Sequence, residues 1–301
     1  MDPDLVFVLA LVPAVLWGLS PIVGKRGMAG GGSSLQASLI VVLVDSVLYW
    51  GALLVTQGPA LGAGVTPASA ALFLAAGLVG TALGRLAVFA GVDRVGASVN
   101  SAVISTRPLF AGLLAVFFLG ETVTLVTIGG IVVLVVGLVV LALSRGGDLS
   151  GWQPYELLFP LAAAAAFGAG NVVRKFGLDL FADITILEAV AFNETGAVIA
   201  LTAYAIAADR RDVFHAPRRT YVYFAANAVL TAIALLSLFA ALRIGRVVVV
   251  DPLVATAPLF TAVFAATFLR DLERVTPRLV AGAVLIVVGV TFIVSNPAVL
   301  L

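Results

Sequence analysis

Cysteine is absent from this 301-residue chain, and histidine occurs only once. Without cysteine there are no disulfide bonds and no thiolate metal sites, while the redox state of the compartment stays open. Metal sites need several ligands, so the single His215, in a charged loop, is expected to be an ordinary surface residue. The sequence therefore predicts neither a metal site nor a cofactor.

Charge is scarce as well. Charged residues make up 11% of the chain and hydrophobic residues 62%, whereas soluble proteins average about 25% charged residues. Too few polar groups are present to cover a surface in water, and a net charge of +1 gives no reason to expect a nucleic-acid partner. The first residues are acidic where a cleaved signal peptide would be basic, so we expect them to begin the first membrane span.

Long apolar stretches fill most of the sequence. A helix needs roughly 20 mostly apolar residues to cross about 30 Å of hydrocarbon, and it must satisfy its own backbone hydrogen bonds there. Ten stretches qualify as membrane-spanning helices: 5–24, 36–56, 68–92, 98–119, 123–143, 154–176, 184–207, 220–242, 247–269 and 276–293. The sequence thus predicts an all-α integral membrane protein, with the lipid bilayer as its surroundings.

The chain also repeats itself at an offset of 150 residues. Phe89 matches Phe239, Thr106 matches Thr256, and the run 108–110 (Pro-Leu-Phe) matches 258–260. After two extra residues in the second copy, Gly130 and Gly137 match Gly282 and Gly289, a spacing that allows close helix packing. Both fifth spans begin after an acidic residue, Glu121 or Glu273, which we expect to cap the helix.

Five spans per copy is an odd number, so the second copy starts on the opposite side of the membrane. We predict two inverted five-helix repeats, residues 1–145 and 146–301, around a central cavity near the bilayer midplane. Both ends of the chain then lie on the same side. We expect a monomer or a weak homodimer.

Three segments resemble the drug/metabolite transporter superfamily, in its ten-helix type with two EamA-like domains. They are WGLSPIVGKR (17–26), FAGVDRVGASVNSAVISTRPLFAGLLAVFFLGETVT (89–124) and FAALRIGRVVVVDPLVATAPLFTAVFAATFLRDLERVT (239–276). The resemblance covers nearly the whole chain. It implies a basket of ten helices, alternating access to a central cavity, export or exchange of small metabolites, and termini in the cytoplasm.

The distribution of positive charge favours the opposite orientation. On the side away from the termini we expect Lys25, Arg26, Arg94, Arg145, Arg210, Arg211, Arg218, Arg219, Arg270, Arg274 and Arg278. On the side of the termini we expect Arg174, Lys175, Arg243 and Arg246. The positive-inside rule therefore predicts external termini in the cell membrane, against the family resemblance.

Ionisable residues inside spans are costly and mark functional sites by default. Five lie in mid-span: Asp45, Arg85, Arg107, Glu194 and Asp251. The neutral polar candidates are Asn100, Asn171, Asn193 and Asn227. We interpret this set as candidates for binding substrate or coupling ions.

Each charged candidate has an alternative reading. The repeat places Asp45 and Glu194 at nearly the same depth in the membrane. There the two carboxylates would take up protons or a cationic substrate. Alternatively, Asp45 would serve as a structural partner of Arg85 or Arg107. No mid-span basic residue is expected in the second half, which favours a functional Glu194. An anionic or zwitterionic substrate would bridge Arg107 and polar groups of the other half. Asp251 would either bind the substrate or cap the start of its own helix.

Pro108 and Pro258 each remove a helical hydrogen bond, at matching positions of the two copies. Three roles are open for them: they act as hinges, they free backbone carbonyl groups for a ligand, or they only kink their helices for packing. Trp17 near the end of the first span is expected to anchor that span at the interface, with stacking on a substrate as the alternative. Lys25 and Lys175 end matched spans and are expected to extend to the headgroups.

These observations favour a secondary transporter that moves a small polar metabolite by alternating access, coupled to protons or to an exchanged solute. An intramembrane enzyme acting on lipid-linked substrates is the first alternative, but the chain has no HExxH, GxSxG or Asp-rich motif. A channel or a structural scaffold is the second. No Walker A motif is present, so we expect no direct coupling to ATP within the chain.

Overall fold

A computed structural model gives the structure of the chain, and it describes residues 3–119, 125–144, 146–210, 213, 215–245 and 247–294. Helices dominate these residues, and two strands of two residues each form one small sheet. The expected cap Glu121 and the counted residues Arg145, Arg211 and Arg246 lie outside the described residues.

The first half contains α1 (Pro3–Ala29), α2 (Ser34–Gln57), η1 (Gly58–Ala60), α3 (Pro67–Ala76), η2 (Gly77–Leu83), α4 (Gly84–Val95), α5 (Ala97–Ile104), α6 (Arg107–Leu119) and α7 (Leu125–Ala142). The second half contains β1 (Gly147–Asp148), η3 (Pro154–Leu157), α8 (Leu158–Leu180), α9 (Ile186–Ala207), α10 (Arg218–Ile244), α11 (Val247–Val254), α12 (Ala257–Phe268), β2 (Glu273–Arg274) and α13 (Pro277–Val294). Every predicted span corresponds to one helix or to two or three consecutive helical elements.

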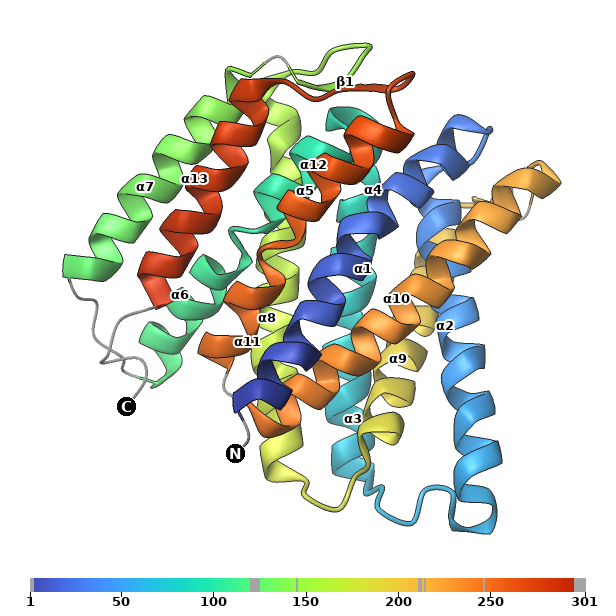
Figure 1. Cartoon of the computed structure of the whole chain (residues 1–301). Coiled ribbons are helices and arrows are strands. Elements are labelled where there is room, and N and C mark those ends of the chain that lie inside the picture. Colours follow the sequence, from blue (N-terminus) through green and yellow to red (C-terminus); the bar gives the residue numbers. More distant parts are fainter. Residues whose placement is uncertain are drawn as a thin grey trace.

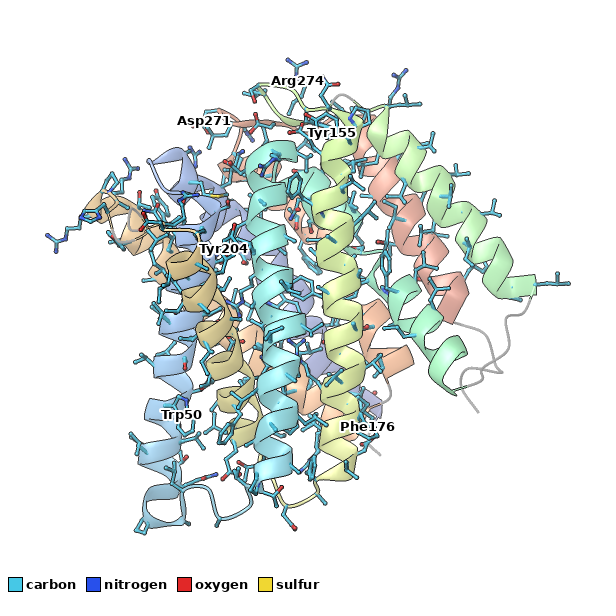
Figure 2. The ribbon with its side chains drawn as sticks, turned by 180° about the vertical axis from the view of Figure 1, so that it is seen from behind. Trp50, Tyr155, Phe176, Tyr204, Asp271 and Arg274 are labelled. Carbon is cyan, nitrogen blue, oxygen red and sulfur yellow. The ribbon has the colours of Figure 1, made fainter. Side chains whose placement is uncertain are left out.

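The two halves run in opposite directions. In Figure 1, α1 rises from the end of the bundle marked N, whereas α8 descends toward that end, and α13 finishes there as well. Figure 2 shows the same for α8 from behind, with Tyr155 before its first residue at one end and Phe176 toward the other. The all-helical membrane fold of ten spanning segments in two inverted repeats is confirmed.

Within the described residues, six helical segments are long and apolar enough to cross a membrane by length and composition. The outer faces of the bundle suit lipid, because large apolar side chains such as Val55, Val47 and Ile206 are more than two-thirds exposed. Polar caps mark the helix ends: Ser33, Thr66 and Thr185 each form a capping box at the start of a span.

The matched glycines of the two fifth spans pack closely, as their spacing predicts, and the structure shows that each span is the partner of the other. α7 and α13 lie side by side (Figure 1). A Cβ atom on Gly137 would lie 3.0 Å from the carbonyl oxygen of Gly282, and one on Gly289 would lie 2.7 Å from that of Gly130. The backbones can approach this closely because these positions lack a side chain.

Two predicted spans are not continuous helices. The span predicted at 98–119 divides into α5 and α6, and the span at 247–269 divides into α11 and α12. Each break ends two residues before a proline. The physical reason is that Pro108 and Pro258 have no N–H to donate to the carbonyl four residues earlier, which belongs to the last residue of α5 or of α11.

Polar contacts tie the halves together at the end of the bundle away from the termini. β1, in the α7–α8 connection, pairs with β2, in the α12–α13 connection, with Asp148 opposite Glu273. Lys25 at the end of α1 reaches Asp148 at 2.5 Å and is only 6% exposed. The expectation that Lys25 extends to the headgroups is therefore wrong. A carboxylate from the other half holds its ammonium group inside the protein.

Glu273 differs from its expected role too. Its carboxylate accepts hydrogen bonds from the Ala97 N–H, the Ser98 N–H and the Ser98 hydroxyl, so it caps α5 rather than its own helix α13. Burial raises the pKa of Glu273 in spite of these hydrogen bonds. Burial works in the same direction on Asp148, but the hydrogen bonds from Lys25 and Ser150 outweigh it and lower its pKa.

Candidate functional site

A cavity of about 100 Å³ lies between the two halves. Its polar lining consists of Ser20, Thr81, Arg85, Asn100, Ser101, Ser105, Arg107, Asn171, Arg174 and Thr231. Its apolar lining consists of Trp17, Pro21, Val88, Phe89, Ile104, Phe167, Leu235, Val254, Ala255 and Ala257. The first half contributes α1, η2, α4, α5 and α6, and the second half contributes α8, α10, α11 and α12, so neither half forms the cavity alone.

Both helix breaks face this cavity and share one hydrogen-bond pattern. At the first break the Thr106 N–H and hydroxyl both donate to the carbonyl oxygen of Val103, at 3.0 and 2.8 Å. At the second break Thr256 makes the same two bonds to Leu253, at 3.2 and 2.7 Å. The internal repeat of the sequence is therefore reproduced in the local geometry of the site.

The two prolines take the second position of the helices that follow these breaks. Pro108 is the second residue of α6, and Pro258 is the second residue of α12. In the first turn the missing N–H has no intrahelical partner to lose, so proline is tolerated without a kink in mid-helix. Their proposed role as hinges stays a prediction.

A π-helical turn positions the polar residues of the third span. η2 follows α3 without interruption and leads into α4, so Thr81 and Arg85 lie on the side that faces α8 and α9. Glycines make room for this contact: a Cβ on Gly77 would lie 1.7 Å from the Asn193 carbonyl oxygen, and one on Gly80 would lie 2.8 Å from the Cα of Gly170. π-helical turns often occur at functional sites.

One end of a buried polar network centres on Arg85. A guanidinium nitrogen lies 2.7 Å from a carboxylate oxygen of Asp45 and 3.6 Å from one of Glu194. Thr231 on α10 contacts Arg85 at 3.3 Å and the two Asp45 oxygens at 3.0 and 3.2 Å. The structural pairing of Asp45 with Arg85 that the sequence left open is present, and the same arginine also reaches the second half.

Arg174 forms the middle of the network. Its three guanidinium nitrogens donate to Asn193 at 3.0 Å, to Asn171 at 2.7 Å and to Thr81 at 2.8 Å. Asn193 donates in turn to Thr81 at 2.7 Å and to Glu194 at 3.2 Å. Arg174 is 2% exposed, so a full cation is held in the protein interior by neutral oxygens.

The other end of the network joins Asp251 and Arg107. Asn171 donates to an Asp251 carboxylate oxygen at 2.8 Å, and an Arg107 nitrogen lies 3.3 Å from the same oxygen. Asp251 is the fifth residue of α11, so the alternative that it caps this helix does not hold. A continuous chain of contacts thus runs from Asp45 to Arg107 and crosses between the halves twice.

The carboxylates form a layer behind the arginines. Asp45, Glu194 and Asp251 are 0 to 1% exposed and none of them lines the cavity, whereas Arg85, Arg107 and Arg174 all do. The three cations and three anions balance formally. A solute in the cavity nevertheless meets guanidinium, amide and hydroxyl groups first.

Most of the predicted site residues come together here. Arg85, Asn100, Arg107 and Asn171 line the cavity, while Asp45, Asn193, Glu194 and Asp251 support its lining. Trp17 lines the cavity as well, because α1 runs to Ala29 and places residue 17 well inside the helix. Interfacial anchoring, the role we expected for Trp17, is therefore wrong.

Asn227 is the candidate that the structure places elsewhere. It is fully buried on α10, where its amide nitrogen would lie 3.5 Å from a Cβ on Gly24, and it is not among the residues that line the cavity. Among the described residues neither of its amide atoms has a hydrogen-bond partner.

Sequence reasoning missed Arg174, Thr81 and Thr231. The sequence places Arg174 at the surface on the side of the termini, because the hydropathy of its span falls near residue 176. The expectation that the second half has no mid-span basic residue is wrong, because Arg174 is buried and donates to Asn193, the neighbour of Glu194. Glu194 also has a basic partner from the first half, since Arg85 lies 3.6 Å from it. A usable signal existed: Arg174 is three residues after Asn171 and shares its helix face. Thr81 and Thr231 gave no signal, because threonine is ordinary in apolar helices.

Comparisons with known proteins agree with this architecture. The profile of the EamA-like transporter family matches the chain twice, at residues 5–143 and 154–295. A protein of Archaeoglobus fulgidus described as an uncharacterized transporter is 25% identical over 295 residues, which is 96% of this chain and 98% of that protein. A solved crystal structure is similar with a TM-score of 0.65 and 14% identity, covering 95% of both chains, and this likeness shows the fold alone. With matches across nearly all of its length, the chain belongs to the EamA-like transporter family.

Proposed function

We propose that this transporter carries a small polar metabolite across the cell membrane by alternating access, as an exporter or exchanger. The observation that supports the proposal most is that the cavity lies between two inverted halves joined there by ion pairs. Arg85 and Arg107 come from the first half, and their partners Glu194 and Asp251 come from the second. Opening the cavity to one side and then to the other requires the halves to move against each other at these contacts.

The contacts at the end of the bundle away from the termini support the same cycle. Lys25 pairs with Asp148 there, and Arg26 pairs with Asp271 at 2.6 Å. Each pair joins the end of α1 to a connection in the second half. We propose that these pairs hold that end closed and separate when the cavity opens toward it.

Glu194 is the proposed coupling residue. Asp45 and Glu194 share the guanidinium of Arg85, but Asp45 holds it at 2.7 Å and Glu194 at 3.6 Å. One Glu194 oxygen has no hydrogen-bond partner among the described residues. The more weakly held carboxylate is therefore the one we propose to accept a proton during transport, which would release the cross-half contact.

Flux measurements on reconstituted protein test this function. Proteoliposomes loaded with a panel of unlabelled metabolites should take up the labelled form of the substrate by saturable counterflow, with a rate that responds to a pH gradient. Glu194→Gln should reduce the pH response of this flux by about tenfold or more, since a proton-transfer group typically contributes at least that much. Asp179→Asn, which removes a carboxylate from the exposed pair with Lys175, is the matched control and should transport normally. Unchanged pH dependence in Glu194→Gln would remove Glu194 from coupling, and absence of counterflow for every solute would refute the carrier function.

A further inference from the structure

We propose that the ligand of this cavity is a small carboxylate with an apolar body, bound through its carboxylate by Asn100 and Arg107. This inference rests on the proposed transport function, since it names the chemical class of the substrate. It depends on three features of the described residues: which buried donors lack partners, how the cavity arginines are neutralised, and what surrounds the remaining space.

Two buried donors at the cavity have no partner. Asn100 is 1% exposed, and within the described part of the chain neither of its amide atoms makes a hydrogen bond. The Nε of Arg107 is also buried and unpartnered there. A buried donor without a partner is unfavourable, so two of them on one cavity indicate a ligand with acceptor atoms.

The orientation of Asn100 supports an acceptor ligand. Its amide oxygen lies against α4, where a Cβ on Gly91 would come within 2.1 Å of it. The amide nitrogen is on the opposite branch of the side chain, away from Gly91. Asn100 lies within α5 and Arg107 begins α6, on either side of the helix break, and both residues line the cavity. Two donors match the two oxygens of one carboxylate.

The cavity arginines carry charge that the protein neutralises incompletely. The nitrogen of Arg107 is 3.3 Å from the Asp251 carboxylate and 3.4 Å from the Asp251 carbonyl oxygen, both long for charge-assisted contacts, which are usually about 2.7–2.9 Å. No carboxylate of the described residues lies within 4.0 Å of the Arg174 guanidinium. A cationic ligand would face these guanidinium groups first, because the acidic side chains are behind them. An anion is therefore favoured.

The rest of the wall requires an apolar body. Trp17, Phe89, Phe167 and Leu235 line the same space, and about 100 Å³ admits only a small molecule. A doubly charged or fully hydrated anion would have to lose its water against these rings without replacement hydrogen bonds, which is unfavourable. One charged head on an apolar chain satisfies both parts of the lining.

Three probes that share one body and differ in the head group test the class. They are 4-methylpentanoate, 4-methylpentanamide and 4-methylpentylamine, titrated calorimetrically into the full-length protein in detergent and then used in proteoliposome counterflow. The carboxylate should bind at least about tenfold more tightly than the amide, because hydrogen bonds to a charged group are stronger than those to a neutral one. Equal or tighter binding of the amide or the amine, or no saturable binding of the carboxylate, would overturn the inference.

Variants at Asn100 and Arg107 test the location. Asn100→Asp keeps the shape of the side chain but replaces the donor with an anion, so it should reverse the preference from the carboxylate to the amine. Arg107→Lys keeps the charge but removes Nε and should weaken carboxylate binding about tenfold or more. Asn227→Ala changes a buried, unpartnered asparagine away from the cavity and should leave the affinity unchanged. An unaltered preference in folded Asn100→Asp protein would place the carboxylate elsewhere and refute the assignment.

The two assays separate this inference from the carrier function. Counterflow of the amine, with none of the carboxylate, would overturn the ligand class and leave the carrier intact. Binding of the carboxylate with no counterflow of any solute would support the ligand class and refute transport.

Discussion

Arg107 and Asp251 meet across the two halves of the protein at matching helix breaks. Arg107 begins α6 after the first break, and Asp251 lies one turn before the second break, with 3.3 Å between their charged atoms. Both residues are at most 5% exposed. The contact joins the two discontinuous helices directly.

Stability should reveal this coupling. Arg107→Gln and Asp251→Asn each leave one buried charge without its partner and should each lower the free energy of unfolding by about 3 kcal/mol, while the double variant should recover most of the loss. Denaturant unfolding of all four proteins in the same detergent measures the pairwise term. Additive losses would show that the two side chains do not interact in the folded protein.

The close contact of η2 with α9 gives a second prediction. Gly77→Ala places a methyl group 1.7 Å from the carbonyl oxygen of Asn193, so the backbones must separate and the network around Asn193 must shift. We expect a loss of about 2–3 kcal/mol in the free energy of unfolding, at the upper end of overpacking effects.

Gly51→Ala is the matched control for that experiment. It makes the same substitution within α2, where a new Cβ meets nothing within 4 Å, and should raise stability by about 0.5–1 kcal/mol through the better helix propensity of alanine. Thermal unfolding of the two variants beside the unmodified protein decides the matter. If Gly77→Ala is as stable as Gly51→Ala, the close packing of η2 on α9 is wrong.

Acid should affect the end of the bundle that Lys25, Asp148 and Glu273 hold together. The pKa of Glu273 is raised above its ordinary value of 4.5, so its contribution to stability is fully present below 4.5 and is lost as the pH rises through the folded pKa. The pKa of Asp148 is lowered below 3.8, so its contribution is present above 3.8 and is lost as the pH falls through the folded pKa.

Melting temperatures of single variants separate these two effects. Relative to Glu273→Gln, the unmodified protein should gain stability as the pH falls from neutral toward 4.5. Relative to Asp148→Asn, it should lose stability only below 3.8. A difference curve with the opposite slope for either variant would contradict the assigned direction of that pKa.

These contacts also show what a sequence can and cannot predict here. Apolar length and the repeat predict the ten spans, the inversion and close packing at the glycines of both fifth spans, because each depends on local composition or on a fixed spacing. The sequence does not predict that α7 and α13 pack on each other, because the spacing names no partner. The charged candidates Asp45, Arg85 and Glu194 are predictable because an ionisable group in mid-span must find a partner. Arg174, Trp17 and Lys25 are not, because their depth depends on where each helix ends and how it packs. Hydropathy places a span only to within a few residues.

The last prediction concerns which side of the membrane each end of the bundle faces. Because the chain contains no cysteine, single introduced cysteines can measure this directly. Ala63 lies in the connection before α3, at the end of the bundle where α1 begins, and His215 lies in the connection before α10, at the other end; both are exposed. Ala63→Cys and His215→Cys, each the sole cysteine of its variant, should react with a membrane-impermeant maleimide from opposite sides of sealed vesicles. The fold is refuted if both react from the same side. The structure buries one counted basic residue on each side, Lys25 and Arg174, so the charge bias toward external termini remains. This bias predicts reaction of His215→Cys from the cytoplasmic side. Reaction of Ala63→Cys from that side would instead agree with the cytoplasmic termini that the family resemblance implies.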